Sequence, residues 1–107
     1  MARALINMPK TARRGEVIEI RALIGHPMET GYRPGADGVV QKRDIIRRFS
    51  VRYNGEQVFA AELYPAISAN PYIAFHTVAT ESGTLVFLWE GDNGFAQTET
   101  AALTVTG

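Results

Sequence analysis

The chain of 107 residues contains no cysteine, only two histidines, and no lysine or arginine after residue 53. Without a thiol, the chain itself offers no disulfide, no thiolate ligand for zinc or an iron–sulfur cluster, and no cysteine nucleophile. Two histidines leave little imidazole for metal binding or acid–base chemistry. The lack of cysteine does not indicate a compartment, because a cysteine-free protein is compatible with oxidising and reducing surroundings alike.

The sequence also has no segment with the pattern of a membrane span or a signal peptide. Two prolines and several polar residues interrupt the longest uncharged stretch, residues 63–80. The apolar stretch near the N-terminus is too short for a signal peptide. The length fits one domain, and 46% hydrophobic with 21% charged residues is typical of a globular fold. We therefore expect a single domain over residues 1–107 and no association with a membrane.

Apolar and polar residues alternate in several short segments, which is the pattern of half-buried strands. Residues 17–24 carry isoleucine or alanine at every second position, and residues 49–53 alternate Phe, Val and Tyr with Ser and Arg. The Asn54-Gly55 pair between two such segments favours a tight hairpin, because its turn needs positive φ angles. The sequence predicts an all-β, immunoglobulin-like antiparallel sandwich of about seven strands. The expected strands are residues 2–8, 17–24, 46–53, 56–63, 72–79, 84–90 and 96–105.

Two segments interrupt the strand pattern, residues 25–44 and residues 63–72. A loop of about 20 residues in a small domain is usually functional or mobile. Methionine and aromatic residues, which are enriched at protein interfaces, gather in and beside both segments. Either they contact a partner, or the two loops cover the core of the domain itself. The residues that we assign to a partner interface are His26, Met28, Glu29, Tyr32, Pro65, Asn70, Pro71, Tyr72 and Phe75.

The residues offer little support for catalysis. No serine lies in the Gly-x-Ser-x-Gly context of a hydrolase nucleophile, and no phosphate-binding loop follows the glycines at 35 and 38. The two histidines have no local ligand spacing, and His76 has the parity of a residue on the face of a strand. We predict no enzymatic activity and no catalytic, cofactor-binding or metal-binding residue. The alternative function is a stand-alone small-molecule or metal-binding module that uses His26, Glu29 and His76.

Charge is distributed unevenly along the chain. Residues 1–53 hold 11 basic and five acidic residues, a net charge of +6, whereas residues 54–107 hold six acidic and no basic residues, a net charge of −6. This asymmetry indicates a charged partner surface, unless the two halves interleave in space and cancel. The densest basic cluster, residues 42–48, has no nucleic-acid motif around it. We therefore expect a solvated face or an acidic protein partner there, and no nucleic acid.

Five blocks of the sequence are distinctive as a set. They are PKTARRGEVIEI at residues 9–20, IGHPMETG at 24–31, YNGE at 53–56, SANPY at 68–72 and TVATESGTL at 77–85. In this order, and over nearly the whole chain, they resemble the SoxZ family. That family supplies one subunit of the SoxYZ sulfur-carrier heterodimer of bacterial thiosulfate oxidation.

The resemblance implies a non-catalytic, immunoglobulin-like subunit that pairs with a SoxY chain. In the family, a cysteine near the C-terminus of SoxY carries the sulfur intermediates, and other Sox enzymes act on the carrier in turn. The resemblance also implies a periplasmic protein that is exported together with SoxY and is cytoplasmic before export. We expect no cofactor, and we expect that the isolated chain can self-associate through its vacant interface.

Overall fold

The computed structural model describes residues 3–32, 34–35, 38–40, 42–65, 67 and 69–107. Among these residues, no helix is long and apolar enough to cross a membrane. The chain is almost entirely β in this described part, with one short 3-10 turn at Asp92–Gly94. The strands are β1 (Ala4–Asn7), β2 (Thr11–Arg13), β3 (Val17–Ile24), β4 (Ile46–Tyr53), β5 (Glu56–Glu62), β6 (Tyr72–Val78), β7 (Gly83–Gly91) and β8 (Ala96–Thr106).

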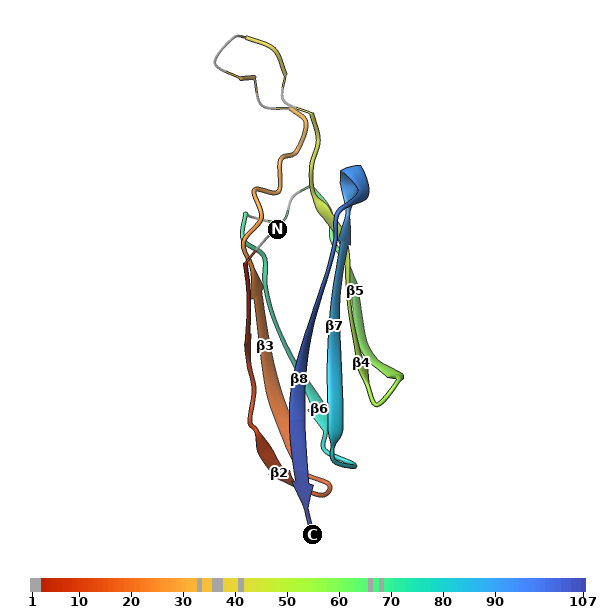
Figure 1. Cartoon of the computed structure of the whole chain (residues 1–107). Coiled ribbons are helices and arrows are strands. Elements are labelled where there is room, and N and C mark those ends of the chain that lie inside the picture. Colours follow the sequence, from red (N-terminus) through yellow and green to blue (C-terminus); the bar gives the residue numbers. More distant parts are fainter. Residues whose placement is uncertain (1–2, 33, 36–37, 41, 66, 68) are drawn as a thin grey trace.

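The strands form two sheets that pack face to face (Figure 1). One sheet has three strands in the order β1-β3-β6, and the other has five in the order β2-β8-β7-β4-β5. The predicted all-β sandwich is confirmed. One strand lies outside the expected ones: β2 pairs parallel with β8, whereas β1, within the expected strand 2–8, pairs antiparallel with β3. The change from one sheet to the other follows Pro9, which has no N–H to donate to a sheet.

The core fills the space between the sheets; it contains every second residue of the central strands and buried residues such as Met28, Ile45 and Leu63 from the segments between them. The predicted alternation of inward and outward side chains in residues 17–24 and 49–53 is confirmed, because the residues of β3 and β4 that were expected to point inward are buried. Large aromatic rings dominate the core, with Phe49 and Trp89 at a centroid distance of 5.0 Å and Phe59 stacked on Phe75 at 4.4 Å. Burial of this much apolar surface is the main contribution to the stability of the fold.

Two turns, β4–β5 and β6–β7, close the end of the sandwich that lies opposite the long connection between β3 and β4 (Figure 1). Asn54 and Gly55 have φ angles of 50° and 85°, which confirms the expected hairpin between β4 and β5. The hydroxyl of Tyr53 accepts the N–H groups of Thr80 and Glu81 at 3.2 and 3.1 Å and donates to the carbonyl of Glu81. These bonds fasten the end of β4 to the connection between β6 and β7.

Between β3 and β4 the chain leaves the sandwich as an extended excursion, which we call the arm (residues 28–44). Glu29 and Asp44 exchange two backbone hydrogen bonds of 2.8 Å, and Pro34 and Val40 form a second antiparallel bridge. The predicted long loop therefore has a local structure in which its two halves run side by side. Figure 1 shows the arm projecting beyond the ends of the sheets, and the molecule measures 60 × 20 × 20 Å.

Candidate functional site

The nine residues that the sequence assigns to a partner interface do not share one surface. Tyr32 and Tyr72 are well exposed, at 83% and 59%, and Asn70 is also exposed. Glu29 and Pro65 are partly buried. Of the remaining four, the three in the loops favour the other interpretation of the sequence, in which the loops cover the core, and Phe75 lies on the inner face of β6. These buried residues are His26, Met28, Pro71 and Phe75.

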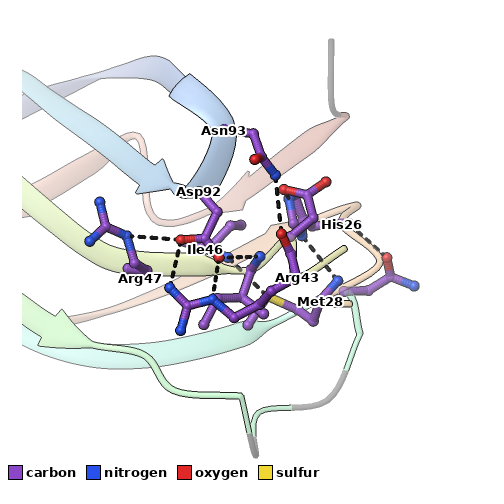
Figure 2. Close-up of polar contacts among 10 residues, drawn as sticks. His26, Met28, Arg43, Ile46, Arg47, Asp92 and Asn93 are labelled. Atoms are coloured by element: carbon purple, nitrogen blue, oxygen red, sulfur yellow. Dashed lines mark hydrogen bonds and ion pairs between the residues drawn. The ribbon is translucent and has the colours of Figure 1, made fainter. Parts of the chain in front are cut away.

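His26 lies at the base of the arm, just after β3 (Figure 2). Its Nδ1 accepts the N–H of Met28 at 3.0 Å, and its Nε2 lies 3.8 Å from Oδ1 of Asp44. The ring meets Phe95 edge to face at 5.0 Å. Burial lowers the pKa of His26, and the carboxylates of Asp44 and Asp92 oppose this effect. The imidazole is therefore neutral at pH 7 and acts as a hydrogen-bond acceptor through Nδ1.

Met28 and Asn70 complete the polar contacts around His26. Met28 has a φ of 50°, an unfavourable value for a residue with a side chain, and its buried sulfur accepts the N–H of Ile46 at 3.3 Å. Asn70 donates its backbone N–H to the carbonyl of His26 at 2.7 Å and accepts the N–H of His26 on Oδ1 at 2.9 Å. The base of the arm is thus tied to β4 and to the connection between β5 and β6.

Asp92, in the turn between β7 and β8, holds the returning half of the arm (Figure 2). Oδ2 accepts a hydrogen bond from Nε of Arg43 at 2.8 Å, and Oδ1 accepts one from Nη2 of Arg43 at 2.9 Å. Oδ1 also lies 3.3 Å from Nε of Arg47. Oδ2 also accepts the N–H of Ile45 at 3.2 Å. The hydrogen bonds from Arg43, together with that N–H and the two cations, keep the pKa of Asp92 low despite its partial burial. We call His26, Met28, Asn70, Arg43 and Asp92 the arm base.

The arm base also accounts for part of the uneven charge along the sequence. Arg43 and Arg47 from the basic half meet Asp92 from the acidic half, and Arg48 pairs with Glu62 at 3.1 Å. The densest basic cluster is therefore paired, in part, within the chain. For these residues the structure supports interleaved halves rather than a charged partner surface.

The residues of the alternative metal or small-molecule site are not brought together. His76 lies on the outer face of β6, with Nε2 at 3.7 Å from Oε2 of Glu19, whereas His26 is buried at the arm base. Within the described ranges, no three His, Cys, Asp or Glu side chains lie close enough to hold a metal ion. In the described part of the chain, these side chains form hydrogen bonds and ion pairs within the fold and no cluster of metal ligands.

A surface that the sequence identified only in part lies on the outer face of the three-stranded sheet. Asn70 and Tyr72 on it were assigned to the interface, whereas Leu5 and Leu23 were not. One hollow is lined by Leu5, Asn7, Arg21, Leu23 and Tyr72. A second one continues from it toward the arm and is lined by Arg3, Leu5, Leu23, Gly25 and Asn70. We call the two hollows together the outer groove. The signal in the sequence was apolar residues on both faces of one strand, as at Leu5 beside Ile6 and Leu23 beside Ile24.

The two sheets differ in what they show to solvent. The large hydrophobic residues of the described strands that are classed as exposed all belong to the three-stranded sheet, namely Leu5, Val17, Tyr72 and Val78. On the five-stranded sheet, the outward Val86 and Leu88 are half-buried. Exposed apolar patches mark interaction surfaces more often than scattered apolar residues do. The outer groove is therefore the candidate contact surface.

Comparison with known proteins relates nearly the whole chain to one family. The family model described as "Sulphur oxidation protein SoxZ" matches residues 6–102. No curated protein sequence is significantly similar to the chain.

Three solved structures share the fold. A superoxide reductase (neelaredoxin) from Ignicoccus hospitalis has a TM-score of 0.74 at 17% identity, with 96% of this chain and 80% of that chain covered. A putative superoxide reductase from Thermotoga maritima has a TM-score of 0.73 at 18% identity, with 97% and 86% covered. The sulfur carrier protein SoxY from Chlorobium limicola f thiosulfatophilum has a TM-score of 0.68 at 13% identity, with 97% and 79% covered. At these identities the likeness concerns the fold alone.

Proposed function

The chain belongs to the SoxZ family, whose model covers residues 6–102, and on this premise we propose that it is the non-catalytic subunit of a SoxYZ-type sulfur carrier. It pairs with a SoxY-like chain, whose C-terminal cysteine holds the sulfur intermediates of thiosulfate oxidation. Its task is to help present that cysteine to the enzymes of the pathway. The family match over nearly the whole chain is the observation that carries this proposal.

Two further observations support the pairing. The chain has no thiol of its own, so in the proposed complex every sulfur adduct on cysteine must reside on the partner. The fold is also that of the solved SoxY sulfur carrier from Chlorobium limicola, so the two subunits of the proposed complex would be similar sandwiches. The outer groove and the exposed Tyr32 of the arm are available for contacts with other chains.

The non-catalytic role is supported by how the reactive side chains are used. His26 is buried and accepts a backbone N–H, and the carboxylate of Asp92 is occupied by two guanidinium groups. His76 lies beside Glu19 on the outer face of the sheet, where both side chains are exposed to solvent. The shared fold with superoxide reductases, at 17–18% identity, carries no activity over to this chain.

We place the working complex in the periplasm and propose that this chain is exported together with its SoxY-like partner. There it meets the other Sox enzymes transiently, each acting on the sulfur that the partner carries. The proposal includes no cofactor, nucleic acid or membrane among the ligands of this chain.

The test is to produce the full chain together with the SoxY-like chain of the same organism, in cells grown on thiosulfate, and to record native and intact masses. We expect a complex of one copy of each chain, with sulfur mass additions on the partner and none on this chain. Two chains that remain separate at both low and high salt would contradict the proposal. A metal or small molecule retained by the separate chain would then favour the module that uses His26, Glu29 and His76.

A further inference from the structure

We infer that the outer groove is the surface on which the SoxY-like carrier docks, through an apolar patch of the carrier that is bordered by a carboxylate. This inference rests on the proposed function and adds to it the position and chemistry of the contact. The argument uses the register of the three-stranded sheet, the charges on its outer face and the place of the groove beside the arm.

The register places three apolar side chains in one row across the sheet. Leu5 of β1 lies directly opposite Leu23 of β3, and Leu23 lies opposite Tyr72 of β6. Leu5 and Tyr72 are 54% and 59% exposed, whereas Ile18, Ile20 and Ile24 on the inner face of the same sheet are buried in the core. A row of this kind resembles the centre of a protein interface, which is apolar and enriched in aromatic residues. Left in water, it contributes nothing to the stability of the isolated domain.

The charges around the row indicate an acidic partner. Glu19 is the carboxylate on this outer face, and it is occupied by Arg21, whose Nη2 lies 2.7 Å away. Arg3, at the arm end of the groove, forms no ion pair with any residue that the structure describes. The face therefore carries one uncompensated positive charge at the end of an apolar row. A partner that brings a carboxylate to Arg3 gains complementarity, and this favours correct orientation as well as fast association.

The same charges make a second copy of this chain the poorer occupant. Two copies related by a two-fold axis would place one positive outer face against the other, and the carboxylate of Glu19 is already paired in each copy. A SoxY-like chain has a different surface, so it does not have to place a positive face of the same kind against this one. We therefore assign the groove to the heterodimer rather than to a homodimer.

The groove is continuous with the base of the arm. Asn70 lines the arm end of the groove and also holds both backbone groups of His26. Gly25, which lines the same hollow, donates its N–H to the carbonyl of Arg3 at 2.8 Å. A carrier seated on the groove thus contacts Gly25 and Asn70, beside the segment from which the arm begins.

The experiment measures the affinity of the full chain for the SoxY-like carrier by titration calorimetry. The variants are Leu5→Asp and Tyr72→Asp, and the matched control is Thr100→Asp, which adds the same charge to the exposed outer face of β8 in the other sheet. We expect each groove variant to weaken binding by about tenfold or more, and the control to change it less than about twofold. Arg3→Glu tests the charge separately, and we expect weaker binding with a reduced dependence on salt.

Each outcome decides a different point. Failure of the wild-type chain to bind the carrier overturns the proposed function and this inference with it. Wild-type binding that survives in Leu5→Asp, Tyr72→Asp and Arg3→Glu overturns only the inference. An isolated wild-type dimer that Tyr72→Asp dissociates, with carrier binding unchanged, reassigns the groove to a second copy. If a strand variant fails to fold, Arg3→Glu still decides the question, because Arg3 precedes the first strand and is exposed.

Discussion

The arm base and the outer groove adjoin each other but are built in opposite ways. At the arm base, His26 and Met28 are buried and the polar side chains have partners within the chain: His26 accepts the N–H of Met28, and Asp92 accepts hydrogen bonds from Arg43. In the groove, apolar side chains such as Leu5 and Tyr72 stay exposed beside a guanidinium without an acidic partner among the described residues. The first arrangement stabilises the fold, whereas the second gains free energy only when another surface covers it.

The comparison explains why methionine, aromatic and polar residues in two loops were ambiguous in the sequence. Such residues are frequent at interfaces, and they are equally suited to close the end of a sandwich where no strand ladder satisfies the backbone. At the arm base, side-chain acceptors take the place of strand-to-strand hydrogen bonds. The Met28 sulfur accepts the N–H of Ile46, and the Asp92 carboxylate accepts the N–H of Ile45. If this account is right, variants of the two regions separate stability from binding.

Trp89→Ala should cause the largest loss of stability among these variants. Trp89 is 1% exposed and packs on Phe49 in the centre of the core. Loss of the indole should reduce the free energy of unfolding by about 3–5 kcal/mol, as measured by urea denaturation. An unchanged midpoint would show that the ring is not in the core.

Met28→Ala should come next, with a loss of about 2–5 kcal/mol, because it removes a buried side chain and the acceptor for the N–H of Ile46. The same urea experiment should leave Tyr32→Ala, the exposed tyrosine of the arm, within about 0.5 kcal/mol of the wild type. Equal effects of the two variants would remove the distinction between a buried arm base and an exposed arm.

Asp92→Ala should cost about 1–3 kcal/mol, because the N–H of Ile45 and the guanidinium of Arg43 lose their acceptor together. Glu62→Ala is the matched control, since it breaks the exposed ion pair with Arg48 and should change stability by less than about 1 kcal/mol. Thermal unfolding of both variants at one ionic strength makes this comparison. A control that costs as much as Asp92→Ala would contradict the special role of the arm base.

Acid should weaken the arm base through His26. Its pKa is lowered in the folded state, so the unfolded chain binds the proton more tightly. The resulting stability is complete above the unfolded pKa of about 6.5 and decreases as the pH falls toward the folded value, by at most about 1.4 kcal/mol per pH unit. Unfolding between pH 7.5 and 5 should show this slope in the wild type and in His76→Gln, but not in His26→Gln.

Tyr72→Asp should have the smallest effect on stability, less than about 1 kcal/mol, because the side chain is exposed on the edge strand β6. Its effect on carrier binding should nevertheless be about tenfold or more. Urea denaturation and calorimetric titration of the same preparation give both numbers. A variant that loses stability and affinity in parallel would mean that the groove, like the arm base, belongs to the fold.

Much of the fold could be predicted from the sequence because the alternation of side chains is strong in its central strands. The expected bounds of β3 and β4 agree with the structure, and the Asn54-Gly55 turn forms as predicted. The separate strand β2 could not be foreseen, because it has only three residues and its parallel pairing with β8 leaves no periodic signal.

The candidate site was harder, because a loop sequence does not reveal which side chains turn inward. Met28 and Phe75 were expected at an interface and are buried, whereas Leu5 and Leu23 were expected in strands and were not assigned to a surface. Only the register shows that Leu5, Leu23 and Tyr72 form one row. Residues so distant in sequence have no local pattern that could connect them.

The central claim is that this chain pairs with a SoxY-like carrier through the outer groove while the arm base keeps its structure. The most direct measurement is a titration of the isotope-labelled chain with the unlabelled carrier, followed by amide and methyl NMR spectra. The account predicts that the changed signals cluster at Leu5, Arg21, Leu23 and Tyr72 on the three-stranded sheet. Changes that cluster instead around Thr98 and Thr100 of β8, on the other outer face, would contradict it.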